Sequence, residues 1–469
     1  MLKLYNSLGQ KKQVFKAAKA KNVTIYTCGP TVYGKPHIGN LASFLTADLL
    51  KRYIKWSGYK VTHVTNITDV DDKMIKGAQT AGISLESYAK PFTEAFFEDL
   101  AALNIEPADY YPRATQYINQ IVDLIKKLLD RGYAYKGSDG SIYFKIAKFR
   151  PYGRLIRLKK QSLKIGVRVA LDDYDKKAAS DFALWKAWTP EDGSVFWDTE
   201  IGKGRPGWHI ECSAMSMSLL GPTIDIHTGA IDLKFPHHTN EIAQSEAATG
   251  KKFVRFWLHR AFLQMGKEKM AKRLGNVLNL DDIINQGFSP RTFRYLVLTN
   301  HYRTPLIYNK EAMKGAKNSL ASIDEFIRRL EGIKTVDGRY KADREVKAVR
   351  KDFQKYFDSD LNAPRAMAVI FRFIRQINQQ INKDKLGAKE AGKILTLFRD
   401  LDRIYGFIFE NKGNKGLCEE VRKLMAERAE AKKRKDYQKA DELRALSVQK
   451  YGVEIRDGKD GEQTWVQKE

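Results

Sequence analysis

The sequence predicts an α/β chain in which a Rossmann-type domain carries an insertion and is followed by a helical bundle and a small terminal module. Three observations indicate this. A short apolar strand over residues 23–26 leads through a turn-rich loop into a long amphipathic helix that ends near Gly58. From Ser289 onward the pattern is almost entirely helical. A polar, glycine-rich stretch over residues 406–416 then separates the bundle from a last segment.

The composition is that of a globular chain with an unusual charge. Its 469 residues are 43% hydrophobic, which is enough to bury a large core and suggests about three domains. No run of eighteen apolar residues and no secretory signal is present, so we expect a cytoplasmic protein without a membrane partner. Three cysteines are too few for a disulfide framework. The net charge of +26 favours a polyanionic partner, although a generally basic proteome would explain the charge equally well.

The first strand–helix unit predicts a phosphate site. Pro36 precedes His37-Ile38-Gly39-Asn40, where the helix should begin. A helix N-terminus offers free N–H groups to phosphates, His37 and Asn40 can add donors, and Gly39 leaves room for a ligand. A helix cap with one surface histidine is the simpler interpretation of so short a motif. Asp48 interrupts the apolar stripe and is expected at its edge.

The remaining elements follow in order along the chain. Residues 60–67 alternate as a second strand, and the polar turn Thr68–Lys73 should cap the helix after it. Short strands with turn signals over residues 132–198 indicate an insertion, after which strand and helix patterns return at residues 207–212, 223–227 and 256–259. Helices are predicted over residues 84–104, 114–131, 318–332, 343–358, 364–384, 388–405, 418–435 and 437–451, with a final strand that ends at Trp465.

Four residues from three regions predict a metal site. His237 and Glu241 lie four residues apart in a predicted helix, so both face one point. Cys28 and Cys212 lie near the ligand-bearing edge of the predicted sheet and could complete a tetrahedral shell. Without the cysteines, a surface hydrogen bond or a structural zinc would explain the helical pair better.

A second basic loop lies downstream, over residues 266–276. Lys269 and Lys272 can reach phosphates from this glycine-flanked support. Alone, the loop is most simply a solvated run of charges. A phosphate-binding role is favoured because the loop follows the motif at His37 in the sequence.

These motifs, in this order, resemble the HIGH and KMSKS signatures of class I aminoacyl-tRNA synthetases. Residues 207–215 and 232–241, with Cys28 ahead of the first motif, resemble the cysteinyl-tRNA synthetase family in particular. Residues 66–74 and 435–441 extend the match over essentially the full chain. The resemblance implies ATP-dependent ligation of L-cysteine to tRNA(Cys) through a cysteinyl-adenylate.

The resemblance also implies roles for individual residues and limits for the domains. ATP, with Mg²⁺, would be bound and activated through His37, Gly39, Asn40, Lys269 and Lys272. One Zn²⁺ per chain, held by Cys28, Cys212, His237 and Glu241, would bind the cysteine thiolate, and Thr68, Trp208 and His227 would lie around the cysteine. The implied parts are the first half of the catalytic domain (1–131), a connective insertion (132–200), the second half (201–288), a stem-contact region with the bundle (289–410) and an anticodon-binding module (411–469).

Some residues depart from the family pattern, and three other functions would fit parts of the sequence. Asn40 replaces the second histidine of the first signature, and Ala271 and Arg273 replace the serines of the second.

A zinc peptidase would not need Lys269 or the basic C-terminal third. A non-catalytic RNA-binding protein would leave the metal shell unexplained. The closest alternative is a related ATP-dependent cysteine ligase that acts on a small amine acceptor, and residues 411–469 argue against it.

Overall fold

The structure is a computed structural model, which describes residues 1–157, 181–265, 268–269, 277–335, 338–409, 419–434, 436–451, 453–457 and 463–467. Its centre is a four-stranded parallel sheet with the order β10-β9-β3-β4. These strands are β3 (Asn22–Thr27), β4 (Lys60–Thr65), β9 (Ile224–Ala230) and β10 (Val254–Arg260). The predicted α/β class with a parallel nucleotide-binding sheet is therefore confirmed.

Helix α1 (Ile38–Trp56) connects β3 to β4 and packs against the sheet. Its N-cap is His37, as the sequence predicted, and Gly58 follows its end with φ +89°. Leu41, Leu45 and other apolar side chains of the helix are fully buried. One prediction for this helix was wrong, because Asp48 is buried rather than placed at the edge of the stripe.

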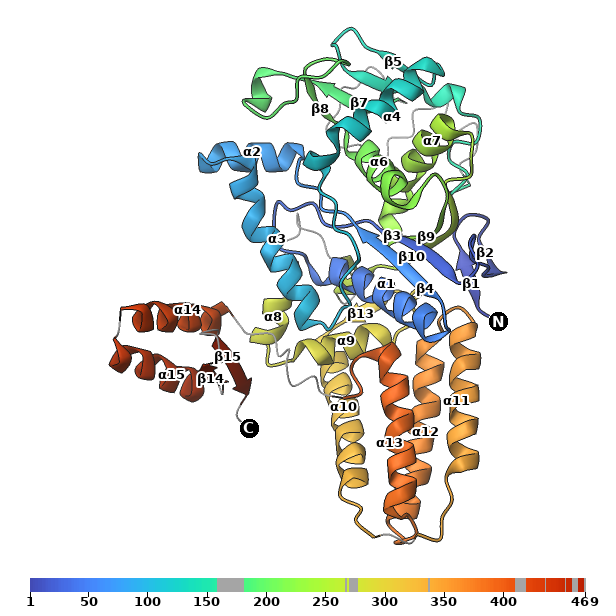
Figure 1. Ribbon diagram of the computed structural model, residues 1–469, viewed down its shortest axis with the longest axis vertical. Coiled ribbons are helices and arrows are strands. Elements are labelled where there is room, and N and C mark those ends of the chain that lie inside the picture. Colours follow the sequence, from blue (N-terminus) through green and yellow to red (C-terminus); the bar gives the residue numbers. More distant parts are fainter. Residues whose placement is uncertain are drawn as a thin grey trace.

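The predicted insertion forms a separate antiparallel sheet with the order β5-β6-β7-β8, seen at the top of Figure 1. Helix α2 begins behind the cap of Asp71, as predicted, and the Asp72 carboxylate at its start binds Lys186 Nζ at 2.7 Å. The ligand-bearing end of the first half is thus tied to the insertion. The elements are α2 (Asp72–Ala81), α3 (Leu85–Ala102), η1 (Ala114–Tyr117), α4 (Ile118–Asp130), β5 (Ala134–Lys136), β6 (Ile142–Phe144), η2 (Ile146–Lys148), β7 (Phe182–Ala187), η3 (Pro190–Asp192) and β8 (Gly204–Pro206).

The second half of the catalytic sheet brings in two helices and a small mixed sheet. Helices α6 and α7 pack on each other above the carboxyl ends of β3 and β9. An N-terminal hairpin, which the sequence did not predict, packs beside β10. The elements are β1 (Lys3–Asn6), β2 (Lys11–Val14), α6 (Trp208–Leu220), η4 (Ile231–Lys234), α7 (His237–Thr249), β11 (Leu263–Met265), β12 (Glu268–Lys269), α8 (Leu280–Asn285), α9 (Pro290–Leu298) and β13 (Leu306–Tyr308).

Four long helices form the predicted bundle at the bottom of Figure 1, and two further helices with a two-stranded sheet follow them. The expected hinge at residues 411–416 lies outside the described residues. No helix among the described residues is long and apolar enough to cross a membrane. The elements are α10 (Lys310–Glu331), α11 (Asp343–Asp358), α12 (Ala363–Ile381), α13 (Ala388–Tyr405), α14 (Glu419–Lys433), α15 (Tyr437–Tyr451), β14 (Val453–Asp457) and β15 (Gln463–Gln467).

Candidate active site

The four predicted metal ligands come from three elements that meet at the carboxyl end of the sheet. Cys28 directly follows β3, Cys212 lies in α6, and His237 and Glu241 lie in the first turns of α7. Gly29 allows this arrangement, because a Cβ atom there would lie 1.5 Å from the carbonyl oxygen of Asn66. The loop after β3 therefore packs backbone against backbone on the end of β4.

The four side chains converge on one point. The Cys28 and Cys212 sulfurs are 4.0 Å apart, and His237 Nε2 lies 3.1 Å from Glu241 Oε1. One donor atom from each residue lies within 4.8 Å of every other. A tetrahedral zinc shell would separate its two sulfurs by about 3.8 Å and its nitrogen and oxygen by about 3.3 Å. The donors and their spacing therefore suit a metal ion of this kind.

A second set of donors overlaps the first, and the sequence did not predict it. Cys28, His227, His238 and Glu241 also place one donor atom each within 4.8 Å of the others. His238 Nε2 lies 3.3 Å from the Cys28 sulfur, and His227 Nε2 lies 3.0 Å from Glu241 Oε2. Glu241 therefore joins both sets through its two oxygens. The doubled histidine of His237-His238 was the signal in the sequence.

Five of the eight histidines of the chain gather here and order one another. His238 Nδ1 pairs with His259 Nε2 at 2.8 Å, and His259 Nδ1 pairs with Ser7 Oγ at 2.7 Å. On the other side, His209 Nδ1 lies 3.0 Å from His237 Nδ1. Hydrogen bonds of this kind fix the tautomer and the orientation of metal-binding imidazoles.

The electrostatics of the cluster favour an ionised Cys212 and Glu241. Burial raises the pKa of the Cys28 thiol well above its usual value, and His237 is held in its protonated form. The hydrogen bond with Cys28 and the charge of His237 outweigh burial and lower the pKa of Cys212 to about 6. Burial would lower the pKa of His237, but Cys212 and Glu241 raise it to about 10. Burial would raise the pKa of Glu241, but His227 and His237 lower it to about 2. Cys212 and Glu241 are thus anionic at neutral pH, which is the form that binds metals.

The first predicted phosphate motif lies at the start of α1, beside the segment that follows the second motif. The His37 ring accepts a hydrogen bond from the Asn40 N–H, and the Asn40 side chain accepts one from the His37 N–H, which closes a capping box. The Ile38 N–H donates to the Leu278 carbonyl at 2.8 Å, and Lys35 pairs with Asp281 at 2.6 Å. The segment after the second motif is therefore bound to the first motif.

The lysines of the second motif are described only in part. Lys269 lies in β12, where its backbone pairs with Gln264 of β11. Lys272 lies outside the described residues. Their role toward ATP phosphates stays a prediction.

The residues expected around the cysteine substrate lie near the quartet of predicted metal ligands, Cys28, Cys212, His237 and Glu241. The Thr68 N–H donates to the Pro30 carbonyl, so Thr68 is held against the loop that follows Cys28. The Trp208 ring lies 4.5 Å from the His237 ring, and His227 is fully buried beneath Glu241. Contact of these residues with cysteine stays a prediction.

Comparison with known proteins decides the family. The family model described as "tRNA synthetases class I (C) catalytic domain" matches residues 14–318. A cysteine–tRNA ligase of Protochlamydia amoebophila (strain UWE25) is 44% identical over 98% of this chain and 97% of its own length. One of Chlamydia felis (strain Fe/C-56) is 45% identical over the same shares. The chain belongs to the cysteine–tRNA ligase family of class I tRNA synthetases.

Further matches cover the C-terminal part of this class I synthetase. The models "DALR domain" and "Cysteinyl-tRNA ligase anticodon binding domain" match residues 352–410 and 414–465. Among solved structures, a methionyl-tRNA synthetase of Mycobacterium tuberculosis in complex with methionyl-adenylate has a TM-score of 0.58 at 16% identity, and covers 83% of this chain and 88% of its own. At that identity the likeness concerns the fold alone, which agrees with the parallel sheet and the helical C-terminal region described above.

Proposed function

We propose that this synthetase ligates L-cysteine to tRNA(Cys) in two steps. In the first, the cysteine carboxylate attacks the α-phosphate of ATP and pyrophosphate leaves. In the second, a terminal ribose hydroxyl of tRNA(Cys) attacks the carbonyl carbon of the cysteinyl-adenylate, and AMP leaves. The observation that supports this most is the convergence of two cysteines, a histidine and a glutamate beside the phosphate-binding end of α1, in a chain whose full-length relatives are named cysteine–tRNA ligases.

The residues at the start of α1 would hold the nucleotide. A carboxylate is a competent nucleophile, so catalysis depends on positioning and on neutralising the charge that develops over the phosphates. The side chains of His37 and Asn40 would supply hydrogen bonds there, and Lys269 and Lys272 would supply positive charge. The Ile38 and Asn40 N–H groups at the start of α1 already donate to Leu278 and His37. Mg²⁺ accompanies ATP.

The quartet Cys28, Cys212, His237 and Glu241 would hold Zn²⁺. Two sulfurs with a nitrogen and a carboxylate oxygen form a donor set that zinc accepts. His227 contacts the Oε2 atom of Glu241, and His209 contacts the Nδ1 atom of His237, so both ligands are held in orientation. Zinc stabilises a bound thiolate far better than an alcohol, so it would favour cysteine over serine. Thr68 and Trp208 close the site on the sides of the β3 loop and α6.

Two further proposals concern the acceptor and the place of the reaction. A related ligase that gives cysteine to a small amine would need no anticodon-binding segment, and the family match over residues 414–465 supports tRNA as the acceptor. For the catalytic, insertion, bundle and terminal parts we propose the domain limits that the sequence predicts. The proposal of a cytoplasmic location rests on the composition alone.

A paired assay tests the proposal. Cysteine-dependent exchange of pyrophosphate into ATP and charging of tRNA(Cys) are measured on the same preparation, together with its zinc content. We expect exchange with cysteine, almost none with serine, and about one zinc per chain. In Cys212→Ala, we expect zinc content and exchange to fall together. Exchange without charging would favour the small-amine acceptor, and full cysteine preference in zinc-free enzyme would remove zinc from the selection step.

A further inference from the structure

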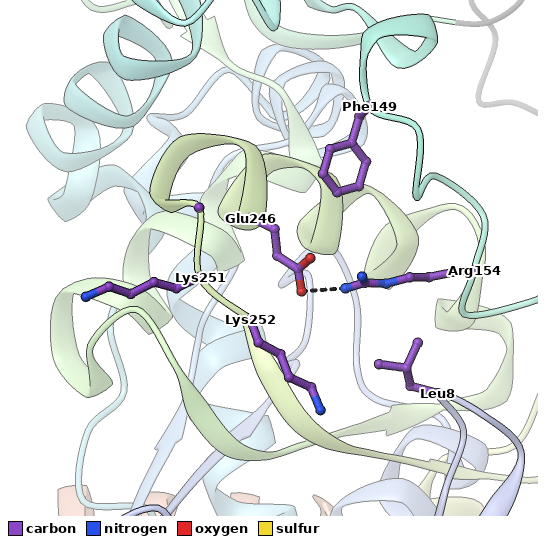
Figure 2. A pocket seen from close by; sticks show the side chains of 7 residues that line it. Leu8, Phe149, Arg154, Glu246, Lys251 and Lys252 are labelled. Carbon is purple, nitrogen blue, oxygen red and sulfur yellow. Dashed lines mark hydrogen bonds and ion pairs between the residues drawn. The ribbon is translucent and has the colours of Figure 1, made fainter.

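A pocket of about 490 Å³ lies at the opposite end of the catalytic sheet from the candidate active site. Lys252 precedes the amino end of β10, whereas Cys28 follows the carboxyl end of the parallel strand β3. Four separate parts of the chain line it, namely the turn after β1, the turn after η2, the end of α7 and the loop into β10 (Figure 2). The lining residues are Leu8, Phe149, Arg154, Glu246, Gly250, Lys251 and Lys252.

The charge of this pocket is positive and only partly balanced. Among the described residues that line it, Glu246 is the single acidic one, and it already binds Arg154 Nη2 and the Phe253 N–H. Within the part of the chain that the structure describes, Arg154 Nε is buried without a hydrogen-bond partner, and the Lys252 ammonium has no ion-pair partner. Figure 2 shows Lys252 extending to the side where Arg154 and Leu8 lie, whereas Lys251 points away from them.

The helix dipole does not account for these cations. Positive side chains are common after a helix C-terminus because they neutralise its last carbonyl groups. Here Arg131 Nη1 already donates to the Ala247 carbonyl at 2.7 Å and to the Ala248 carbonyl at 3.1 Å, and the Gly250 N–H donates to the Glu246 carbonyl. The end of α7 is therefore satisfied without Lys252.

Burial and neighbouring positive charges both disfavour the charged form of Lys252. Burial, followed by the nearby charges of Arg154 and Arg255, lowers the pKa of Lys252. An anion between Lys252 and Arg154 would remove this repulsion. Guanidinium and ammonium groups together are suited to phosphate, which accepts several charge-assisted hydrogen bonds.

We propose that this pocket binds the phosphate group of a small phosphorylated molecule. Arg154 and Lys252 contact the phosphate, and Leu8 with Phe149 forms an apolar wall for the part of the ligand attached to it. The volume lies in the range of ligand pockets and leaves room for such a group. Free pyrophosphate and a nucleoside monophosphate share this chemistry. The site is independent of the proposed function.

Binding of pyrophosphate and of AMP to the full chain, measured by isothermal titration calorimetry, tests the proposal. Both compounds also suit the active site, so the number of sites is the readout. We expect two sites in the wild-type chain. Lys252→Ala should weaken one of them about tenfold, as for loss of one charge-assisted hydrogen bond, and leave the other unchanged. Two sites with AMP and one with pyrophosphate would show that the organic part is needed.

Three variants make the result decisive. Lys351→Ala removes another exposed lysine, from α11, and should retain both sites. Lys252→Arg retains the charge and should recover binding to within about threefold. Cysteine-dependent exchange should be unchanged in Lys252→Ala, which reports correct folding. One site for both probes in the wild-type chain, a Lys252→Ala titration equal to that of the wild type, or a loss that Lys252→Arg does not recover would each overturn the proposal.

Discussion

At the scale of single residues, Asp48 shows what a local pattern cannot predict. Its carboxylate is buried and accepts hydrogen bonds from Arg52 Nε at 2.8 Å, Arg294 Nη2 at 2.6 Å and the Glu106 N–H at 2.9 Å. Arg294 in turn donates to the carbonyl oxygens of Leu103 and Tyr405. Arg52 lies in α1 itself, but Arg294 and Glu106 come from α9 and from the turn after α3. The stripe of α1 alone therefore placed Asp48 wrongly at the edge.

Replacing Asp48 should reduce stability strongly and in a pH-dependent way. Asp48→Asn leaves the Arg294 guanidinium buried without its counter-charge, which costs about 3–5 kcal/mol at pH 7. Burial would raise the pKa of Asp48, but Arg294 and Arg52 lower it below its usual value. Its stabilising effect is therefore present above an unfolded pKa of about 3.9 and is lost as the pH falls through the folded value.

Urea unfolding of the wild type and of Asp48→Asn between pH 7 and pH 3.5 measures this. The difference in free energy of unfolding between the two proteins should begin to decrease only near the acidic end of that range. Glu325→Gln is the control, because Glu325 pairs with Arg328 on the exposed face of α10 and should matter little. A constant gap over the whole range would show that the charge of Asp48 is not the source of its effect.

The parts of the candidate site that could be predicted are those with a pattern of residues close together in the sequence or next to a predicted strand. His237 and Glu241 could be paired from their spacing on one helix, and the two cysteines from their place near strand ends. For the second donor set the doubled histidine was the only local signal, because His227 and His238 lie on β9 and α7 and meet only through the packing of these elements.

At the scale of elements, most long amphipathic helices were predictable, although α10 begins at Lys310 rather than at the predicted residue 318. The short strands β5, β6 and β7 fall in the stretch predicted for them, but several other short strands were not predicted. The limits of α11 and α13 agree with the sequence pattern, and α1 differs from its prediction by one or two residues. The strands β1, β2, β13 and β14 were missed. Each has only three to five residues. β13, for example, exists because it pairs with β11 more than forty positions earlier, which no local pattern records.

The start of α1 gives the prediction at this scale. A Cβ atom at Gly39 would lie 2.9 Å from Nδ1 and 3.0 Å from Cε1 of His37, so Gly39→Ala must displace the His37 ring. Because positioning governs the activation step, we expect its rate to fall by about 10- to 100-fold, with a smaller change in the KM for ATP. Cysteine-dependent pyrophosphate exchange measures both.

Gly392→Ala is the matched control for Gly39→Ala. Gly392 lies within α13, and a Cβ atom there meets nothing within 4 Å among the described residues. Alanine favours a helix over glycine, so this variant should be as active as the wild type and slightly more stable. Equal activity of the two variants would show that the position of His37 does not limit activation.

At the scale of the whole molecule, the chain combines a catalytic sheet with a terminal module that has a small core of its own. Val421, Ala440, Leu443 and Ile455 are buried among α14, α15 and β14. The bundle and the catalytic sheet are tied together by a large common core. With a net charge of +26, the whole chain is suited to a long polyanion, and its parts need not contribute equally to catalysis and to binding.

Removal of the terminal module should therefore separate the two proposed steps. A chain cut after Lys415 retains the residues around the quartet and α1, so pyrophosphate exchange should stay within about twofold of the full chain. Charging of tRNA(Cys) should fall by about 10²-fold, because the contacts expected from the family match over residues 414–465 are gone. Binding of tRNA by the full chain should weaken steeply between 50 and 200 mM salt, and the cut chain should show a shallower slope, since fewer phosphates are neutralised. Filter binding over a salt series and charging assays on both chains measure this. Equal charging by the two chains, or equal slopes, would remove the terminal module from tRNA recognition.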